Sequence, residues 1–254
     1  MAAESQSTPE SNVDGWRLLG TRDFGCLWAG QVVSQIGDGL NKVALLWFVY
    51  EMTGSALKMT AIGLLQTIPP LLFGPLIGVY LDYLPKKTVM IGVDFLRALM
   101  VLLIPLFYTF DMLTLERLYV LVFLISIVST VFGPALASAV PLIVQRSQLT
   151  TANAFLQSTT NIGVLLGPAM SGLGIALIGA QNVLYVDAAT FLVSALFLLP
   201  IRVRDSRTVK GLDVLATPVM QDMMVGFRFV FLQHRVVFAL MITAVLYNLA
   251  ISAF

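Results

Sequence analysis

The sequence predicts an all-α membrane protein, a six-helix bundle followed by a truncated seventh transmembrane helix, and three observations support this fold class. Apolar residues make up 58% of the 254 residues and charged residues only 11%, whereas soluble domains have about a quarter charged residues. Mean hydropathy is +0.89. Apolar segments of membrane length follow one another along the chain. Two of them carry nearly the same phrase, around Gly74-Pro75 and Gly167-Pro168, which indicates an internal repeat.

The apolar segments define the candidate spans, because about 20 apolar residues rising about 1.5 Å each cross a hydrocarbon core of about 30 Å. Residues 1–16 lack apolar periodicity and are expected to form a disordered cytoplasmic tail. A bundle over 17–200 is followed by a cytoplasmic connector, 201–235, whose apolar residues recur every four positions as in an amphipathic helix. The candidate spans are 25–50, 59–82, 88–110, 116–140, 151–179, 181–200 and 236–254, the last one incomplete.

The distribution of Lys and Arg predicts the orientation. With a cytoplasmic N-terminus, the outer connections contain only Lys58 and Arg117. The cytoplasmic segments contain Arg17, Arg22, Lys86, Lys87, Arg146 and the six basic residues from Arg202 to Arg235. An excess of basic residues in cytoplasmic loops is typical of membrane proteins. We therefore expect a multi-pass protein of the cell (inner or plasma) membrane with its N-terminus in the cytoplasm.

Composition also excludes several function classes. A net charge of +1 argues against nucleic-acid binding by bulk charge. The lone Cys26 cannot form an intrachain disulfide, and the lone His234 has no Ser, Cys or metal-ligand cluster around it in the sequence. We expect no catalytic residues, no metal site and no cofactor, so an intramembrane enzyme is disfavoured.

The first span carries the strongest polar signal. Gln31, Gln35, Asp38 and Lys42 are spaced by four, three and four residues, which places them on one face of a helix. Polar groups inside a membrane are costly, so this stripe should face other helices or a water-filled cavity. Two interpretations are open. Asp38 and Lys42 form a self-neutralising pair that only orients the helix, or Asp38 couples protons or contacts substrate with Lys42 as its partner.

Three further charged residues lie in apolar spans. Asp94 and Arg97 are three residues apart in the third span and can pair on one helix face, which favours a structural role. Asp187 lies near the outer end of the sixth span. We expect it to be an interfacial carboxylate or part of a helix hydrogen bond rather than a site residue.

The fifth span contains a helix-packing motif. Gly163, Gly167 and Ser171 recur every four residues and form a groove for a neighbouring helix, and Pro168 permits a bend. Together with Gly172, this stretch resembles the Gly-x-x-x-Gly-Pro-x-x-Gly-Gly motif of drug and proton antiporters of the major facilitator superfamily. Ser171 stands where that family has glycine.

A second motif of the same superfamily, Gly-x-x-x-Asp-Arg-x-Gly-Arg-Lys, is similar to residues 78–87. The matching residues are Gly78, Asp82, Lys86 and Lys87. Tyr83 replaces the arginine and Pro85 the second glycine. The resemblance implies that Asp82 helps to lock a cytoplasmic gate against the other half of the transporter; a solvated turn is the alternative.

Residues 17–254 resemble the branch of the superfamily that contains the enterobactin exporter and macrolide efflux proteins. The resemblance implies twelve helices in two bundles, each built from two inverted three-helix repeats. This chain would supply the first bundle of a secondary efflux transporter, a proton antiporter for a small molecule such as a drug, siderophore or metabolite. Because one bundle alone should not transport, we expect either a fragment or a half-transporter that needs a C-terminal bundle or a second copy. A non-transporting membrane scaffold is the alternative function.

Overall fold

The computed structural model describes residues 13–81, 84–203 and 243. The chain divides into two compact units, Met1–Thr208 and Val209–Phe254, and every described residue except Thr243 belongs to the first. Several predictions therefore lie outside the described residues. These are the tail up to residue 12, Asp82, His234, and the connector and partial seventh helix apart from residues 201–203 and Thr243.

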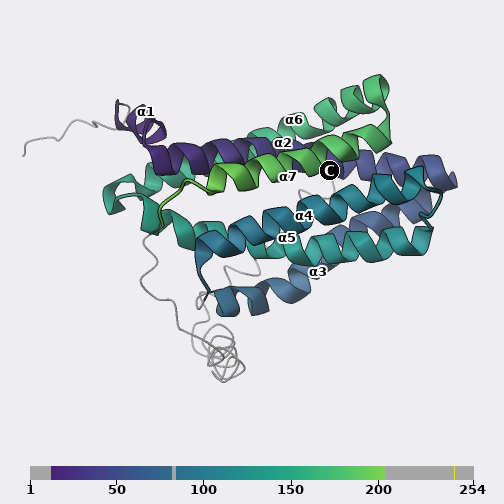
Figure 1. Cartoon of the computed structure of the whole chain (residues 1–254), viewed down its shortest axis with the longest axis horizontal. Helices are drawn as coiled ribbons and strands as arrows, with labels where there is room; N and C mark the ends of the chain where they lie inside the picture. The colour runs from purple at the N-terminus through teal and green to yellow at the C-terminus, as the bar shows by residue number, and fades with distance from the viewer. Residues whose placement is uncertain (1–12, 82–83, 204–242, 244–254) are drawn as a thin grey trace, which may run out of the picture. The chain divides into compact units, whose positions relative to one another are not determined.

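The described part of the first unit consists of helices without strands (Figure 1), which confirms the all-α class. Short connections link long helices, as expected for a polytopic membrane protein. The elements are α1 (Val13–Leu19), α2 (Arg22–Thr53), α3 (Ala56–Leu81), α4 (Lys86–Thr109), α5 (Leu115–Ile143), a 3₁₀ turn (Arg146–Gln148), α6 (Leu149–Ile178) and α7 (Ala180–Leu198).

Local sequence determines where these helices begin and end. Gly54 ends α2 in the left-handed conformation (φ 61°), and its N–H donates to the Tyr50 carbonyl, a conformation that glycine adopts without steric cost. At the start of α5 the Thr114 hydroxyl accepts a hydrogen bond from the Arg117 N–H (3.3 Å). Such caps satisfy terminal backbone groups that have no partner within the helix.

The six complete spans expected from the sequence correspond to α2 through α7, within a few residues at each end. Five described helices, α3 to α7, contain stretches long and apolar enough to cross a membrane. Although α2 has 32 residues, it is not among the five, because its polar stripe lowers its hydropathy. It packs against α7, α6 and α3, so these neighbours shield its polar residues from lipid.

The packing partners of the six long helices reveal the internal repeat. Helix α2 packs on α6 and α7, whereas α5 packs on α3 and α4, and α4 and α7 pack on each other. If α2, α3 and α4 trade places with α5, α6 and α7, each of these contacts becomes another contact of the same set. The two groups of three helices therefore have equivalent packing partners. Consecutive helices reverse direction, so helices three positions apart run in opposite senses. The two three-helix units are thus inverted relative to each other, as the resemblance implied.

Helix α1 begins within the segment expected to be a disordered tail. Residues 13–19 are helical and Leu18 is fully buried. Trp16 and Trp28 both contact the Phe155 ring edge-on, with centroid distances of 6.4 and 6.3 Å. The prediction of a tail up to residue 16 is therefore wrong for its last four residues, because aromatic contacts to α6 hold them in place.

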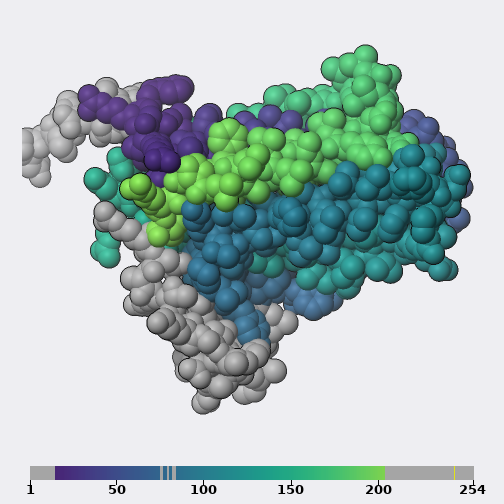
Figure 2. Space-filling view, viewed as in Figure 1, coloured from purple at the N-terminus to yellow at the C-terminus, as the bar shows by residue number. Residues whose placement is uncertain are grey.

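Buried apolar side chains form two main clusters, one at each end of the bundle. One gathers around Phe24, Met90 and Phe132, and the other around Phe48 and Leu184. A small third cluster joins α4 to α7. The outer surfaces of these two helices lie side by side on the face seen in Figure 2. Three buried charged residues, Asp94 and Arg97 of α4 and Asp187 of α7, lie between the two ends. The site is therefore a polar layer at mid-depth between two apolar cores.

Candidate functional site

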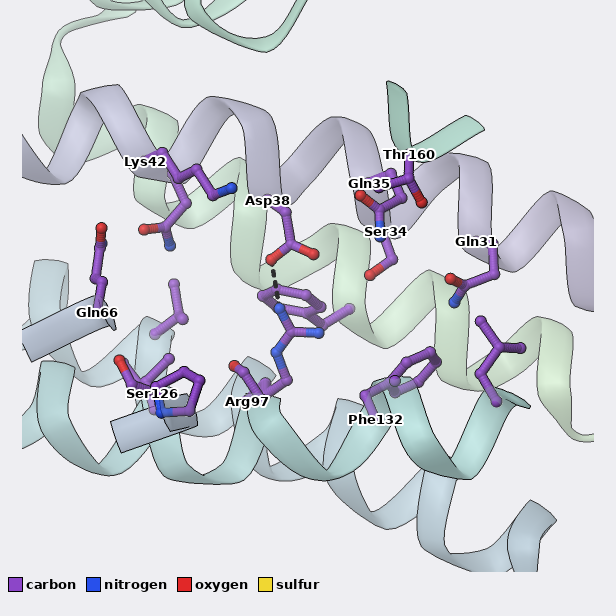
Figure 3. A pocket seen from close by; sticks show the side chains of 18 residues that line it. Gln31, Ser34, Gln35, Asp38, Lys42, Gln66, Arg97, Ser126, Phe132 and Thr160 are labelled. Atoms are coloured by element: carbon purple, nitrogen blue, oxygen red, sulfur yellow. Dashed lines mark hydrogen bonds and ion pairs between the residues drawn. The ribbon is translucent and has the colours of Figure 1, made fainter. Parts of the chain in front are cut away.

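A cavity of about 460 Å³ opens at this mid-depth layer. Helix α2 supplies one wall with Gln31, Ser34, Gln35, Asp38, Asn41 and Lys42. The opposite wall includes Arg97 of α4 and Ser126 and Phe132 of α5, while Thr160 of α6 lies beside Gln35 on the α2 side (Figure 3). Gln66 of α3 also lines the cavity. The four stripe residues predicted from the sequence thus all line one space. Their side chains face this cavity rather than lipid, as the cost of polar groups in a membrane requires.

An ion pair crosses the cavity from α2 to α4. Arg97 Nη2 donates to Asp38 Oδ1 (Figure 3), and the side chains of Arg97 and Asp38 are 7% and 30% exposed. The expected partner of Asp38, Lys42, is exposed and makes no ion pair within the described part of the chain. The prediction of an Asp38–Lys42 pair is therefore wrong. The true partner lies 59 residues further along, where helical periodicity gives no signal.

Arg97 has two further neighbours. Its guanidinium carbon lies 3.9 Å from the centroid of the Phe191 ring, in a cation–π arrangement. Its Nη1 lies 3.9 Å from Asp94 Oδ1, an oxygen without a hydrogen-bond partner among the described residues. Ser194 of α7 donates to the other oxygen of Asp94 at 2.7 Å. Arg97 is thus hydrogen-bonded to one carboxylate, Asp38, and has a second carboxylate, Asp94, close by.

Asp187 lies beside the cavity, in a position that sequence reasoning missed. It is fully buried between α2 and α7 rather than interfacial, and the Asn41 side-chain amide donates to its Oδ2. Asn41 itself lines the cavity. The sequence did hold a signal, because 93 positions separate Asp94 from Asp187, as they separate Gly74 from Gly167. The two carboxylates are therefore equivalent positions of the inverted repeat.

The residues of the fifth-span motif divide into two groups. Gly163, Gly167 and Ser171 are buried against α2, whereas Pro168 and Gly172 are exposed. A Cβ added at Gly167 would lie 2.6 Å from the Gly39 Cα, closer than real Cβ atoms approach backbone. The predicted groove therefore exists, and the helix that occupies it is α2. None of these residues lines the cavity.

The lysines of the second motif cap helix ends. Lys86 Nζ donates to the carbonyls of Leu81 (2.6 Å) and Leu84 (2.8 Å) at the end of α3. Lys87 Nζ donates to the Leu199 carbonyl (2.7 Å) just after α7. Cations at helix C-termini are stabilised by unpaired carbonyls and by the helix dipole. Gly78 is half-buried, with nothing within 4 Å of an added Cβ. A gate role for these residues stays a prediction.

Comparison with known proteins agrees with this architecture. Residues 14–254 match a family described as transmembrane secretion effectors. The chain belongs to the major facilitator superfamily. Several relatives in the superfamily are named as efflux proteins and others as transporters, which confirms the prediction that the chain is not an enzyme. Among the described residues, no group of three or more His, Cys, Asp or Glu could hold a metal ion.

Three superfamily relatives are each 30% identical to the chain. Macrolide efflux protein A of Streptococcus pyogenes aligns over 237 residues, 92% of this chain and 56% of that protein. The multidrug efflux pump Tap of Mycolicibacterium fortuitum aligns over 212 residues, 82% of this chain and 50% of the pump. Macrolide efflux protein A of Enterococcus faecalis aligns over 197 residues, 76% and 59% respectively. The chain spans about half the length of the curated relatives it matches.

Proposed function

We propose that this chain forms one six-helix bundle of a secondary transporter that exports a small organic molecule in exchange for protons. The single observation that carries the proposal is the ion pair between Asp38 and Arg97, placed across a polar cavity between two apolar cores. Intramembrane charges of this kind commonly mark substrate or proton pathways. The names of the relatives, which describe efflux of macrolides and of multiple drugs, support the direction of transport.

Proton binding would act on the cavity through Arg97. A proton on Asp38 removes the negative charge that Arg97 faces, so the attraction across the cavity is lost. Arg97 can then turn to Asp94, whose free Oδ1 already lies 3.9 Å from Nη1. The exchange avoids leaving a buried guanidinium without a carboxylate, which would cost about 3–5 kcal/mol. The α2 wall is then free to move relative to α4.

The cavity lining indicates an amphiphilic substrate. Gln31, Gln35 and Gln66 offer amide donors and acceptors, whereas Phe132 and Phe191 offer aromatic surfaces. Sites of this composition bind mostly apolar molecules and orient them with a few polar contacts. A macrolide combines a large apolar ring with several hydroxyls, so it is the first substrate to test.

The bundle would lie in the cell membrane with α2 starting on the cytoplasmic side. Arg22, Lys86 and Arg146 lie near helix ends on that side, and Lys58 and Arg117 lie near ends on the other. Adding the other basic residues of the sequence gives the asymmetry expected of cytoplasmic loops. Alternating access requires a second bundle that faces the cavity. That bundle would come from a C-terminal half or from a second copy of the chain.

The test is efflux from cells that express the complete reading frame containing this chain. We expect such cells to accumulate less radiolabelled erythromycin than cells with an empty vector, and a protonophore to abolish the difference. Asp38→Asn cannot exchange a proton, so accumulation should return to the empty-vector level. Glu51→Gln, at the exposed far end of α2, is the matched control and should keep wild-type efflux.

Two results would contradict the proposal. Efflux by Asp38→Asn that still depends on the proton gradient would remove Asp38 from the coupling mechanism. The second result concerns cells with and without the protein in the membrane. If both accumulate macrolides to the same level, and likewise the fluorescent drugs used for multidrug pumps, the protein is a non-transporting scaffold.

A further inference from the structure

The Asp187 carboxylate is buried with few polar partners. It is 0% exposed, its Oδ2 accepts one hydrogen bond from the neutral Asn41 amide, and its Oδ1 has no partner among the described residues. An ionised carboxylate buried without a cation and with a free oxygen is strongly disfavoured. The neutral carboxylic acid avoids this cost.

Among the described residues, no cation lies within ion-pair distance of Asp187. Helices α2, α4 and α6 pack against α7, and α6 has no ionisable side chain. The charged groups that act on Asp187 are Asp38 from α2 and Arg97 from α4, with Asp94 at 3.9 Å from Arg97. Arg97 is engaged by Asp38, and Lys42 is exposed on α2.

Asp187 differs from Asp94, its equivalent in the repeat, in its distance from a cation. Both are fully buried and both accept one side-chain hydrogen bond, from Asn41 and Ser194 respectively. Only Asp94 meets the ion-pair distance to a cation, at 3.9 Å from Arg97. Equivalent positions of the repeat thus hold one carboxylate with a nearby cation and one without.

Asn41 connects this buried carboxylate to the cavity. Its side chain is half-buried, lines the cavity and donates to Asp187. Gly37 packs closely on the same carboxylate, because a Cβ added there would lie 2.6 Å from Asp187 Oδ1 and closer still to the Thr190 hydroxyl. Asn41 is thus a cavity-lining residue in direct contact with the Asp187 side chain.

We propose that Asp187 is a buried proton-binding residue that exchanges its proton with the cavity through Asn41. When the Asn41 amide turns away, the Asp187 O–H bond breaks, the proton passes to a cavity water, and the carboxylate remains. The reverse step restores the acid. Within the proposed antiport function, on which its role in transport rests, Asp187 would be a second proton site beside Asp38.

Infrared difference spectroscopy of the chain in liposomes tests this proposal directly. A carboxylic C=O stretching band reports a protonated carboxylic acid, and single Asp→Asn variants assign the band to a residue. We expect one such band in the wild-type chain, its loss in Asp187→Asn, and its retention in the matched variant Asp94→Asn. Absence of the band from the wild-type chain, or its retention in Asp187→Asn, would overturn the assignment.

A second variant tests the route and does not depend on how Asp187→Asn folds. On transfer to heavy water, the wild-type band should shift as the proton is replaced by a deuteron. In Asn41→Leu the band should persist but shift at least about tenfold more slowly, because the polar link to the cavity is gone. An equally fast shift in Asn41→Leu would overturn exchange through Asn41.

The spectra are recorded without transport, so they separate this proposal from the proposed function. A band that behaves as expected in a protein without efflux would reject proton antiport alone. Proton-dependent efflux in a protein that lacks the band would reject the role of Asp187 alone.

Discussion

The two Gly-Pro phrases of the sequence lie in equivalent helices but make unequal contacts. In α6, an added Cβ at Gly167 would lie 2.6 Å from the Cα of Gly39 in α2. In α3, an added Cβ at Gly74 would meet nothing nearer than the Thr130 methyl group of α5, at 3.7 Å. The α2–α6 interface is thus backbone against backbone, whereas the α3–α5 interface is in ordinary van der Waals contact.

This difference indicates that the α2–α6 side of the bundle is fixed and that the α3–α5 side can adjust. Small residues let helices approach closely in membranes, where packing rather than the hydrophobic effect drives association. At the α2–α6 interface neither backbone can shift without a clash. Helix α3, which supplies Gln66 and Pro70 to the cavity, has room against α5. We therefore expect changes in cavity shape to involve α3 more than α6.

The largest effect that tests this comparison is expected from Gly167→Ala. The new methyl group would meet the Gly39 backbone, which cannot rotate away, and overpacking of this kind costs about 3 kcal/mol. The matched variant Gly74→Ala has space for its methyl group and gains helix propensity, worth up to about 1 kcal/mol.

Unfolding in mixed micelles with increasing dodecyl sulfate, followed by tryptophan fluorescence, gives both free energies of unfolding. We expect Gly167→Ala to be destabilised and Gly74→Ala to be unchanged or slightly stabilised. Equal destabilisation of the two variants would show that the two interfaces are equally tight.

A smaller effect is expected one turn earlier in α6. An added Cβ at Gly163 would lie 3.1 Å from the Gln35 carbonyl oxygen, so the neighbour has to yield by only a few tenths of an ångström. Gly163→Ala should lose about 1 kcal/mol of unfolding free energy. The control is Gly133→Ala in α5, where nothing lies within 4 Å, and it should lose none. A Gly163→Ala protein as stable as wild type would limit the fixed contact to Gly39 and Gly167.

The sequence predicted the elements far better than it predicted contacts between them. Hydropathy and turn signals place α2 to α7, because helix formation and membrane length are local properties. The Gly-Pro phrase located two equivalent helices, but it could not show which contact is tight. That depends on the facing residue, Gly39 in one case and Thr130 in the other.

The site shows the same limit. Helical spacing correctly grouped Gln31, Gln35, Asp38 and Lys42 on one face, but it suggested the local Lys42 as partner of Asp38 instead of Arg97. The position of Asp187 near a helix end suggested an interface. Only its packing against Asn41 of α2 shows that it is buried. Charge partners on different helices are a property of the tertiary fold.

The smallest effect concerns Ser171, which lies on the face of α6 that packs on α2. Its hydroxyl donates to the Leu40 carbonyl of α2 at 2.8 Å and is fully buried. Hydrogen bonds between membrane helices contribute about 0.6 kcal/mol on average, so Ser171→Ala should lose about that amount in the same unfolding assay. Ser126→Ala removes a bond of equal length to Val122 within α5 itself, and it should have almost no effect. Equal losses in both variants would mean that the bond from Ser171 to α2 contributes no more to stability than a bond within one helix.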